Sequence, residues 1–210
     1  MKKFEVVNSL PYLILSLVFG LVILFVSMTR ASFELMAKED GEAKLRVSPV
    51  VFVMREEDGA MQEYSYKLPE VKTLPNNPFY GFKKLRDYLW LSFSQGDVKK
   101  AKTAFLLADK KMAEARELII EGEIRIALEA SQEGLEKLKY ADTLLSRSME
   151  KGDEVRQMRE EIYLAGMAYG EIVKEVENGF DKGGEKYNKV KEDINEFNQK
   201  IKKEREERSI

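Results

Sequence analysis

The residues in this chain best suited to chemistry are its carboxylates. The sequence has 37 Asp and Glu residues but no Cys and no His. Thiolate nucleophiles, Ser-His-Asp catalysis and metal sites built on His or Cys are therefore excluded. Paired carboxylates could still hydrolyse a glycosidic bond or bind Mg²⁺ or Ca²⁺. Such a site would need Asp or Glu side chains that converge in a cleft between helices.

The distribution of these carboxylates indicates a solvated surface instead. They are scattered at high density along helical stretches, without EF-hand or phosphate-loop spacing. We therefore expect no enzyme activity, no cofactor, and no catalytic, cofactor-binding or metal-ligating residue. Because 35 basic residues nearly balance the acidic ones, the net charge is -2. No nucleic-acid partner is expected at that charge, and no small-molecule substrate is evident.

The first element that the sequence predicts is a membrane anchor. Residues 6–29 carry no charge, and about 20 apolar residues in a helix suffice to cross a hydrocarbon core of about 30 Å. Lys2, Lys3 and Arg30 flank this run, as they would flank a membrane span. The run is too long for a typical signal peptide, and a poor cleavage site follows it. Residues 1–30 are therefore interpreted as an uncleaved anchor in contact with membrane lipid, with a cleaved signal peptide as the alternative.

Residues 31–75 are predicted to form a stalk that contains a short β-hairpin. Apolar residues alternate on either side of Asp58-Gly59, a dipeptide typical of hairpin turns. The alternating residues are Val50, Phe52 and Met54 before the turn and Tyr64, Tyr66 and Leu68 after it. Because an isolated hairpin is marginally stable, a partly ordered, extended stalk is the alternative.

A helix is predicted to begin after this stalk, with Asn77 as its N-cap and Pro78 as its first residue. Apolar residues then recur every three or four positions, while Lys83 and Lys84 lie on another face. The apolar positions are Phe79, Phe82, Leu85, Leu89 and Phe93. We expect the aromatic residues of this stretch to pack in the core against the helical hairpin that follows. These residues are Phe79, Tyr80, Phe82, Tyr88, Trp90 and Phe93. Contact with a membrane surface and a peptide- or ligand-binding groove are the alternatives.

Glycines divide the next part of the chain into long helices. Gly96, Gly122 and Gly152 each precede an acidic residue, so each pair can end one helix and begin the next. Apolar residues spaced by three and four predict helices packed side by side as antiparallel hairpins. The predicted seam residues are Val98, Ala101, Phe105, Ala108, Met112, Ala115 and Ile119 in the first helix, and Ile124, Leu128, Ser131, Leu135, Leu138, Asp142, Leu145 and Met149 in the second.

The same spacing continues through residues 152–210. Gly179, Gly183 and Gly184 interrupt it, and each glycine costs a helix about 1 kcal/mol relative to alanine. Two helices or one kinked helix are therefore expected. The seam residues are Val155, Met158, Ile162, Ala165, Tyr169, Ile172 and Val176 before the break, and Phe180, Gly183, Tyr187, Val190, Ile194, Phe197 and Ile201 after it.

Together these elements predict an all-α protein whose long helices form an antiparallel bundle with coiled-coil-like packing. The predicted parts are a transmembrane helix at residues 1–30, a stalk or hairpin at 31–75, a helical domain at 76–151 and a C-terminal coiled-coil extension at 152–210. Periodicity alone does not choose whether the seams pack within the chain, against a second copy or against another protein.

Two stretches also carry a resemblance: LPNNPFYGFKKLR at residues 74–86 and KKAKTAFLLADKKMAEA at residues 99–115. They resemble a family of bacterial exported or membrane-anchored helical proteins described as a domain of unknown function. The resemblance spans residues 68–145 and implies an all-helical domain outside the cytoplasmic membrane of a bacterium. It brings no catalytic residues. Gly81 stands where the family usually shows proline, and Gly96-Asp97 stands where it tends to show Asp-Pro.

These features predict a single-pass, membrane-anchored helical protein of the bacterial cell envelope. Its helical body would lie outside the cytoplasm and act as a non-enzymatic interaction or spacing module. Basic residues on both sides of the apolar run, including Lys38 and Lys44 after it, leave the orientation open. A cytoplasm-facing, membrane-tethered coiled-coil adaptor is therefore the second hypothesis. A carboxylate-dependent hydrolase or metal binder is the third.

Overall fold

A computed structural model describes residues 12, 14–16, 19–20, 23, 49–55, 59–71, 73–78, 80–148, 152–179 and 184–209. The chain forms two compact units, Met1–Ala43 and Lys44–Ile210. In the first unit the described residues are helical, while most of the predicted anchor at residues 6–29 lies outside the described residues. Within the described part of the chain, no helix is both long enough and apolar enough to span a membrane.

The second unit begins with the predicted hairpin, which is confirmed. Strand β1, Val50–Arg55, pairs with strand β2, Met61–Tyr66, in an antiparallel two-stranded sheet. Phe52 lies opposite Tyr64, and the two rings stack with their centroids 5.9 Å apart. The buried residues of β1 are Val50, Phe52 and Met54, as the alternation predicted.

This hairpin is stable because a helix covers its apolar face. Both strands contact helix α5, Asp153–Gly179, and the buried side chains of β1 belong to the same core as the helices. The alternate residues Val51 and Val53 face away and are exposed. A two-stranded sheet needs such a packing surface to persist in water.

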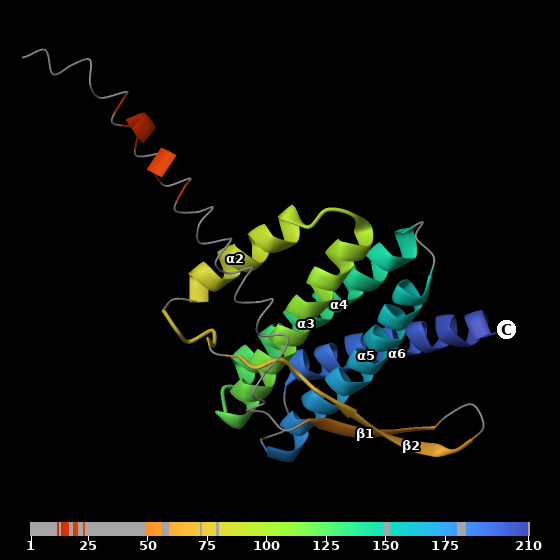
Figure 1. Cartoon of the computed structure of the whole chain (residues 1–210). Helices are drawn as coiled ribbons and strands as arrows, with labels where there is room; N and C mark the ends of the chain where they lie inside the picture. Colours follow the sequence, from red (N-terminus) through yellow and green to blue (C-terminus); the bar gives the residue numbers. More distant parts are fainter. Residues whose placement is uncertain are drawn as a thin grey trace, which may run out of the picture. The chain divides into compact units, whose positions relative to one another are not determined.

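The rest of the unit is helical (Figure 1). The other helices are α2, Tyr80–Phe93; α3, Asp97–Ile120; α4, Ile124–Arg147; and α6, Glu185–Ser209. Helices α3 and α4 lie side by side and share the largest contact, while α5 packs against α3, α4, α6 and the hairpin. Helix α2 makes its main contact with α3. The fold is mostly helical, as predicted, with one small antiparallel sheet in the described residues.

The predicted seams form the core. Every predicted seam residue of α5 is buried, from Val155 to Val176. In α3 all are buried except Phe105, which is half-buried, and in α4 all described members are buried except Ile124, which is half-buried. The buried seam residues of α6 are Tyr187, Val190, Ile194, Phe197 and Ile201. Three predicted members, Met149, Phe180 and Gly183, lie outside the described residues.

The turn between α3 and α4 explains Gly122. Its φ of 82° lies in the left-handed region that favours glycine. The Gly122 N–H donates to the Ile119 carbonyl at 3.1 Å, and the Glu123 N–H donates to the Leu118 carbonyl at 2.8 Å. This pair of bonds is a Schellman motif that satisfies the last carbonyls of α3, so Gly122 occupies the C′ position that the sequence predicted.

Two other helix boundaries differ from the prediction. Gly96 is itself the N-cap of α3, with a φ of 82°, and Asp97 is the first helical residue, without a capping bond. Its charge still favours the positive end of the helix. Helix α2 begins at Tyr80 and not at Pro78, because the Tyr80 N–H bonds the Asn77 carbonyl at 3.0 Å in a single preceding turn. Shifts of one or two residues are typical of helix ends.

Ser131 and Asp142, the polar members of the α4 seam, are both buried. The Ser131 hydroxyl donates to the Ala127 carbonyl one turn earlier, at 3.0 Å. Asp142 accepts a hydrogen bond from Lys200 of α6, at 3.0 Å. These bonds allow polar groups in an otherwise apolar seam, because a buried polar group is costly only when it lacks a partner.

Candidate functional site

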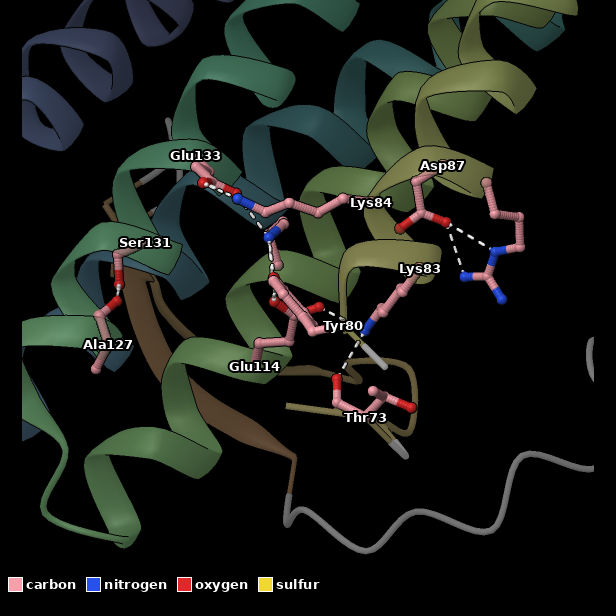
Figure 2. Close-up of polar contacts among 11 residues, drawn as sticks. Thr73, Tyr80, Lys83, Lys84, Asp87, Glu114, Ala127, Ser131 and Glu133 are labelled. Carbon is pink, nitrogen blue, oxygen red and sulfur yellow. Dashed lines mark hydrogen bonds and ion pairs between the residues drawn. The ribbon is translucent and has the colours of Figure 1, made fainter. Parts of the chain in front are cut away.

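Helix α2 packs on the bundle with its polar side turned inward. Tyr80 is buried, and its hydroxyl donates to Oε2 of Glu114 at 2.6 Å. Lys83 donates to Oε1 of the same carboxylate at 2.5 Å. Glu114 lies in α3 and has no exposed surface. Figure 2 shows Tyr80 and Lys83 directed from α2 toward Glu114.

The same contacts extend to α4. Lys111 of α3 pairs with Glu133 of α4 at 2.6 Å and with Glu114 at 3.2 Å, and it also bonds the Tyr80 hydroxyl. Lys84 of α2 reaches Glu133 at 3.1 Å. We call Tyr80, Lys83 and Lys84 the inward polar face of α2. This face joins three helices through a connected network of charges.

Electrostatics keep Lys111 and Glu133 charged at neutral pH. Burial alone would lower the pKa of Lys111, but the Glu114 and Glu133 carboxylates hold it above its usual range. Burial would raise the pKa of Glu133, but its bonds to Lys111 and Lys84 keep that pKa below its usual value. Burial, with the bond to Glu114, raises the pKa of the Tyr80 phenol, which therefore stays a hydrogen-bond donor.

This network fixes which side of α2 faces the bundle. Removing one partner of a buried ion pair typically costs about 3–5 kcal/mol, because the other charge is left uncompensated. If α2 turned about its axis to bury its apolar side, Glu114 would lose Tyr80 and Lys83 together. The buried carboxylate therefore holds the helix in this rotation.

The opposite side of α2 is apolar and exposed. Leu85 is 53% exposed, Tyr88 69% and Phe93 67%. Phe82 is exposed as well, and we call these four residues the outward apolar face. They recur at helical spacing on one side of α2. Leu91, on the other side, packs against the core.

The predicted core packing of the aromatic residues is confirmed for Tyr80, which is buried. It is wrong for Phe82, Tyr88 and Phe93, which are exposed, while Trp90 is half-buried and Phe79 lies outside the described residues. Leu85 is also exposed, and Leu89 is half-buried. Periodicity correctly placed the apolar residues on one face and Lys83 and Lys84 on another. It could not show which face is turned inward, because that depends on Glu114, more than 30 residues further along the chain.

A second polar cluster lies between the hairpin and the helices. The Tyr66 hydroxyl of β2 donates to both oxygens of Asp109, at 2.8 and 3.0 Å. The Tyr169 hydroxyl of α5 donates to Oδ1 at 2.8 Å. Burial raises the pKa of Asp109 to about 7, against the lowering by these two bonds, and the charge of Glu161 raises it further. The cluster ties β2, α3 and α5 together around a carboxyl that titrates near neutral pH.

An open depression of about 400 Å³ lies beside β1, with Arg116 and Glu175 in its lining. These two side chains form an ion pair at 2.9 Å. Lys174 and Glu171, also in the lining, pair at 2.7 Å. Glu177, the remaining charged residue of the lining, pairs with Lys191 of α6 at 2.7 Å. Each charge of the lining thus has a partner in the protein, which gives an anion or cation little to bind. Across the described ranges, no set of three or more acidic residues is arranged to hold a metal ion.

The sequence predicted no catalytic, cofactor-binding or metal-ligating residue, and it interpreted the carboxylates as solvated. Glu114 and Asp109 depart from that interpretation because both join elements of the fold. One local signal could have singled out Glu114. It stands between Ala113 and Ala115, and small residues on both sides indicate a helix packed on more than one face.

The fold and these clusters define a helical-bundle protein with a small β-hairpin packed on its core. The chain belongs to the family described as a domain of unknown function (DUF5667), whose model matches residues 72–209. The match reaches past the predicted limit of residue 145 and includes α5 and α6, so the extent estimated from the resemblance was too short. No curated protein and no solved structure matches the chain.

Proposed function

We propose that this protein is a single-pass, membrane-anchored helical protein of the bacterial cell envelope. Its helical body acts outside the cytoplasm as a non-enzymatic interaction module. The long helices α3 to α6 pack in a coiled-coil-like manner and present α2 on a stiff support. The outward apolar face of α2 is the observation that carries this proposal, because clustered exposed apolar side chains mark sites of interaction.

Two features support the anchor. Residues 6–29 carry no charge and are long enough for a membrane span. Among the described residues of this run, Tyr12, Leu15 and Phe19 are helical and expose more than half of their surface. A helix with apolar side chains directed outward is stable in lipid, which solvates those side chains.

The support for an interaction module comes from the placement of α2. Tyr80 and Lys83 bond the buried Glu114, so α2 contacts the bundle through its polar side. The apolar side is exposed on the surface of the body. These exposed apolar side chains do not contribute to the core, and the buried charge network holds them in one orientation, where they can contact a partner.

The orientation is tested by protease accessibility in intact bacterial cells that express the full chain with a C-terminal tag. Loss of the tag, while a cytoplasmic marker stays intact, is the expected result. Protection of the tag until the cells are opened would instead favour the cytoplasm-facing adaptor. The size of the membrane-protected fragment then reports whether the N-terminal segment is retained.

The anchor is tested separately with the double variant Leu15→Arg, Phe19→Arg. Each arginine at the centre of a span costs about 2.5–3.5 kcal/mol of insertion free energy. We expect this variant to leave the membrane fraction, while Leu15→Ala, Phe19→Ala stays in it. Equal membrane retention of both double variants would contradict a span at residues 6–29.

A further inference from the structure

We propose that the outward apolar face of α2 rests on the lipid surface of the membrane that holds the anchor. This inference rests on the membrane anchoring in the proposed function, and it names the partner of the α2 face. The chemistry of the face, the pairing of the charges behind it and the length of the connection between anchor and body favour this contact.

The outward apolar face has the composition of an interfacial helix. Leu85 and Phe93 can enter the boundary between headgroups and acyl chains, while Tyr88 combines an apolar ring with a hydroxyl that can stay hydrated. The four residues of the face carry no charge. Aromatic side chains are enriched at membrane interfaces for this reason.

The cationic residues of α2 do not contribute a basic patch beside this face. Lys83 binds Glu114, Lys84 binds Glu133, and Arg86 binds Asp87 at 2.7 Å. Each of these three cations thus has a carboxylate partner in the protein, although Glu114 and Glu133 are also paired with Lys111. The contact with lipid should therefore depend on apolar burial, and it needs neither anionic headgroups nor low salt.

A connection of limited length tethers the helical body to the predicted span. Residues 30–49 connect the predicted span to β1, and about 20 extended residues reach at most about 70 Å. A face of four residues binds lipid weakly by itself. A tether of this length raises the effective concentration of the surface, so weak affinity is sufficient.

A lipid surface fits this face better than a protein does. Protein interfaces commonly use charged and polar groups to set the register between the partners. On this side of α2 the polar groups are the Tyr88 hydroxyl and the Ser92 hydroxyl, which donates to the Tyr88 carbonyl at 2.8 Å. A bilayer requires no register. A second copy of this chain remains the competing occupant, and the experiment below distinguishes the two.

The test uses the full chain reconstituted in vesicles of phosphatidylcholine, which has no net charge. Because the sequence has no Cys, Phe93→Cys introduces a single thiol for a fluorophore that responds to polarity. The control is Ile120→Cys, at the end of α3, since Ile120 is 67% exposed, the same as Phe93. Leu85→Cys provides a second position on the face.

We expect blue-shifted emission from the labels at Phe93 and Leu85, and quenching by brominated lipid several-fold stronger than at Ile120. High salt should leave both effects unchanged. Vesicles that float with the protein but give equal, weak quenching at all three positions would overturn the lipid contact and leave the anchor intact. A blue shift that grows with protein density, without quenching by lipid, would identify a second copy as the occupant.

Flotation of the vesicles separates this inference from the proposed function. Protein that fails to float with the vesicles would overturn the anchor and, with it, the lipid contact that depends on it. Circular dichroism of each labelled variant verifies the fold, and both substituted positions on the face are exposed, so the helical content should equal that of the parent chain.

Discussion

At Gly166 of α5, an added side chain would meet the side chain of Asn198 from α6. The Asn198 amide of α6 donates to the Gly166 carbonyl at 2.9 Å, and a Cβ on Gly166 would lie 2.3 Å from Oδ1 of Asn198. Gly81, in α2, is also helical, but a Cβ there meets nothing within 4 Å. Substitution of Gly81 is therefore a control for substitution of Gly166.

Gly166→Ala should have a free energy of unfolding about 1–2 kcal/mol below that of Gly81→Ala, because both gain helix propensity but only at Gly166 must Asn198 move and lose its bond. Gly81→Ala should raise the free energy of unfolding by up to about 1 kcal/mol through helix propensity. Urea denaturation followed by circular dichroism measures both. A Gly166→Ala variant as stable as Gly81→Ala would contradict the close approach.

Asp109 should make stability depend on pH in an unusual direction. Its folded pKa of about 7 lies above the ordinary value of 3.8, so between these values the folded chain keeps a proton that the unfolded chain has released. The contribution of Asp109 to the free energy of unfolding is largest below pH 3.8. It falls as pH rises to about 7, by up to about 1.4 kcal/mol per pH unit. Above pH 7 the loss should level off.

The measurement is the difference in unfolding free energy between the parent chain and Asp109→Asn, from pH 4 to pH 8.5. This difference removes the contributions of other titrating groups, which are the same in both chains. Glu133 is one of them: because its pKa is lowered, its contribution to stability falls at acidic pH. The parent should lose stability relative to the variant between pH 4 and pH 7. A flat difference would show that Asp109 titrates as an ordinary carboxyl.

At the scale of elements, the hairpin should contribute to the stability of the bundle. Phe52 is buried, while its neighbour Val53 is 54% exposed on the opposite face of the strand. Phe52→Ala is expected to cost about 3–5 kcal/mol through lost burial and the cavity left behind, and Val53→Ala about 0.5 kcal/mol or less. Equal, small losses in thermal unfolding would indicate a hairpin independent of the core.

Docking of α2 should depend on one buried carboxylate. Glu114→Gln leaves Lys83 and Lys111 without a full counter-charge, and we expect α2 to be destabilised by about 3–5 kcal/mol. The single Trp of the chain, Trp90, lies in α2. Its fluorescence should therefore change at a lower urea concentration than the helical signal of the whole protein.

Glu154→Gln is the control for that experiment. Glu154 forms an exposed pair with Lys102, and such pairs contribute little to stability. In this variant the Trp90 transition and the helical transition should coincide. Coincident transitions in Glu114→Gln as well would show that α2 is held mainly by other contacts.

At the scale of the whole molecule, binding and stability should be separable on α2. Leu85→Ser and Phe93→Ser remove exposed apolar groups. The free energy of unfolding, measured by thermal unfolding, should therefore change by about 0.5 kcal/mol or less. Leu91→Ser, on the side packed against the core, should be clearly destabilising. If the serine variants of the outward face lost as much stability as Leu91→Ser, that face would be part of the core.

Much of the fold could be predicted from the sequence because its signals are local or periodic. Val50, Phe52 and Met54 alternate as a half-buried strand must, and the seam from Val155 to Val176 repeats with the period of a helix. Gly122 marks a helix end through its own backbone preference. Gly96 shows the limit of such signals, because the same residue type served as an N-cap there.

The sequence by itself determined which residues share a face, where glycine interrupts the helices, and that Cys and His chemistry is excluded. Only the tertiary structure decided which face of α2 turns inward. Burial is a property of the assembled chain, and Glu114 becomes a buried anion only after α3 is covered on several sides. Asp109 acquires its raised pKa in the same way, when Tyr66 and Tyr169 close around it from distant parts of the chain.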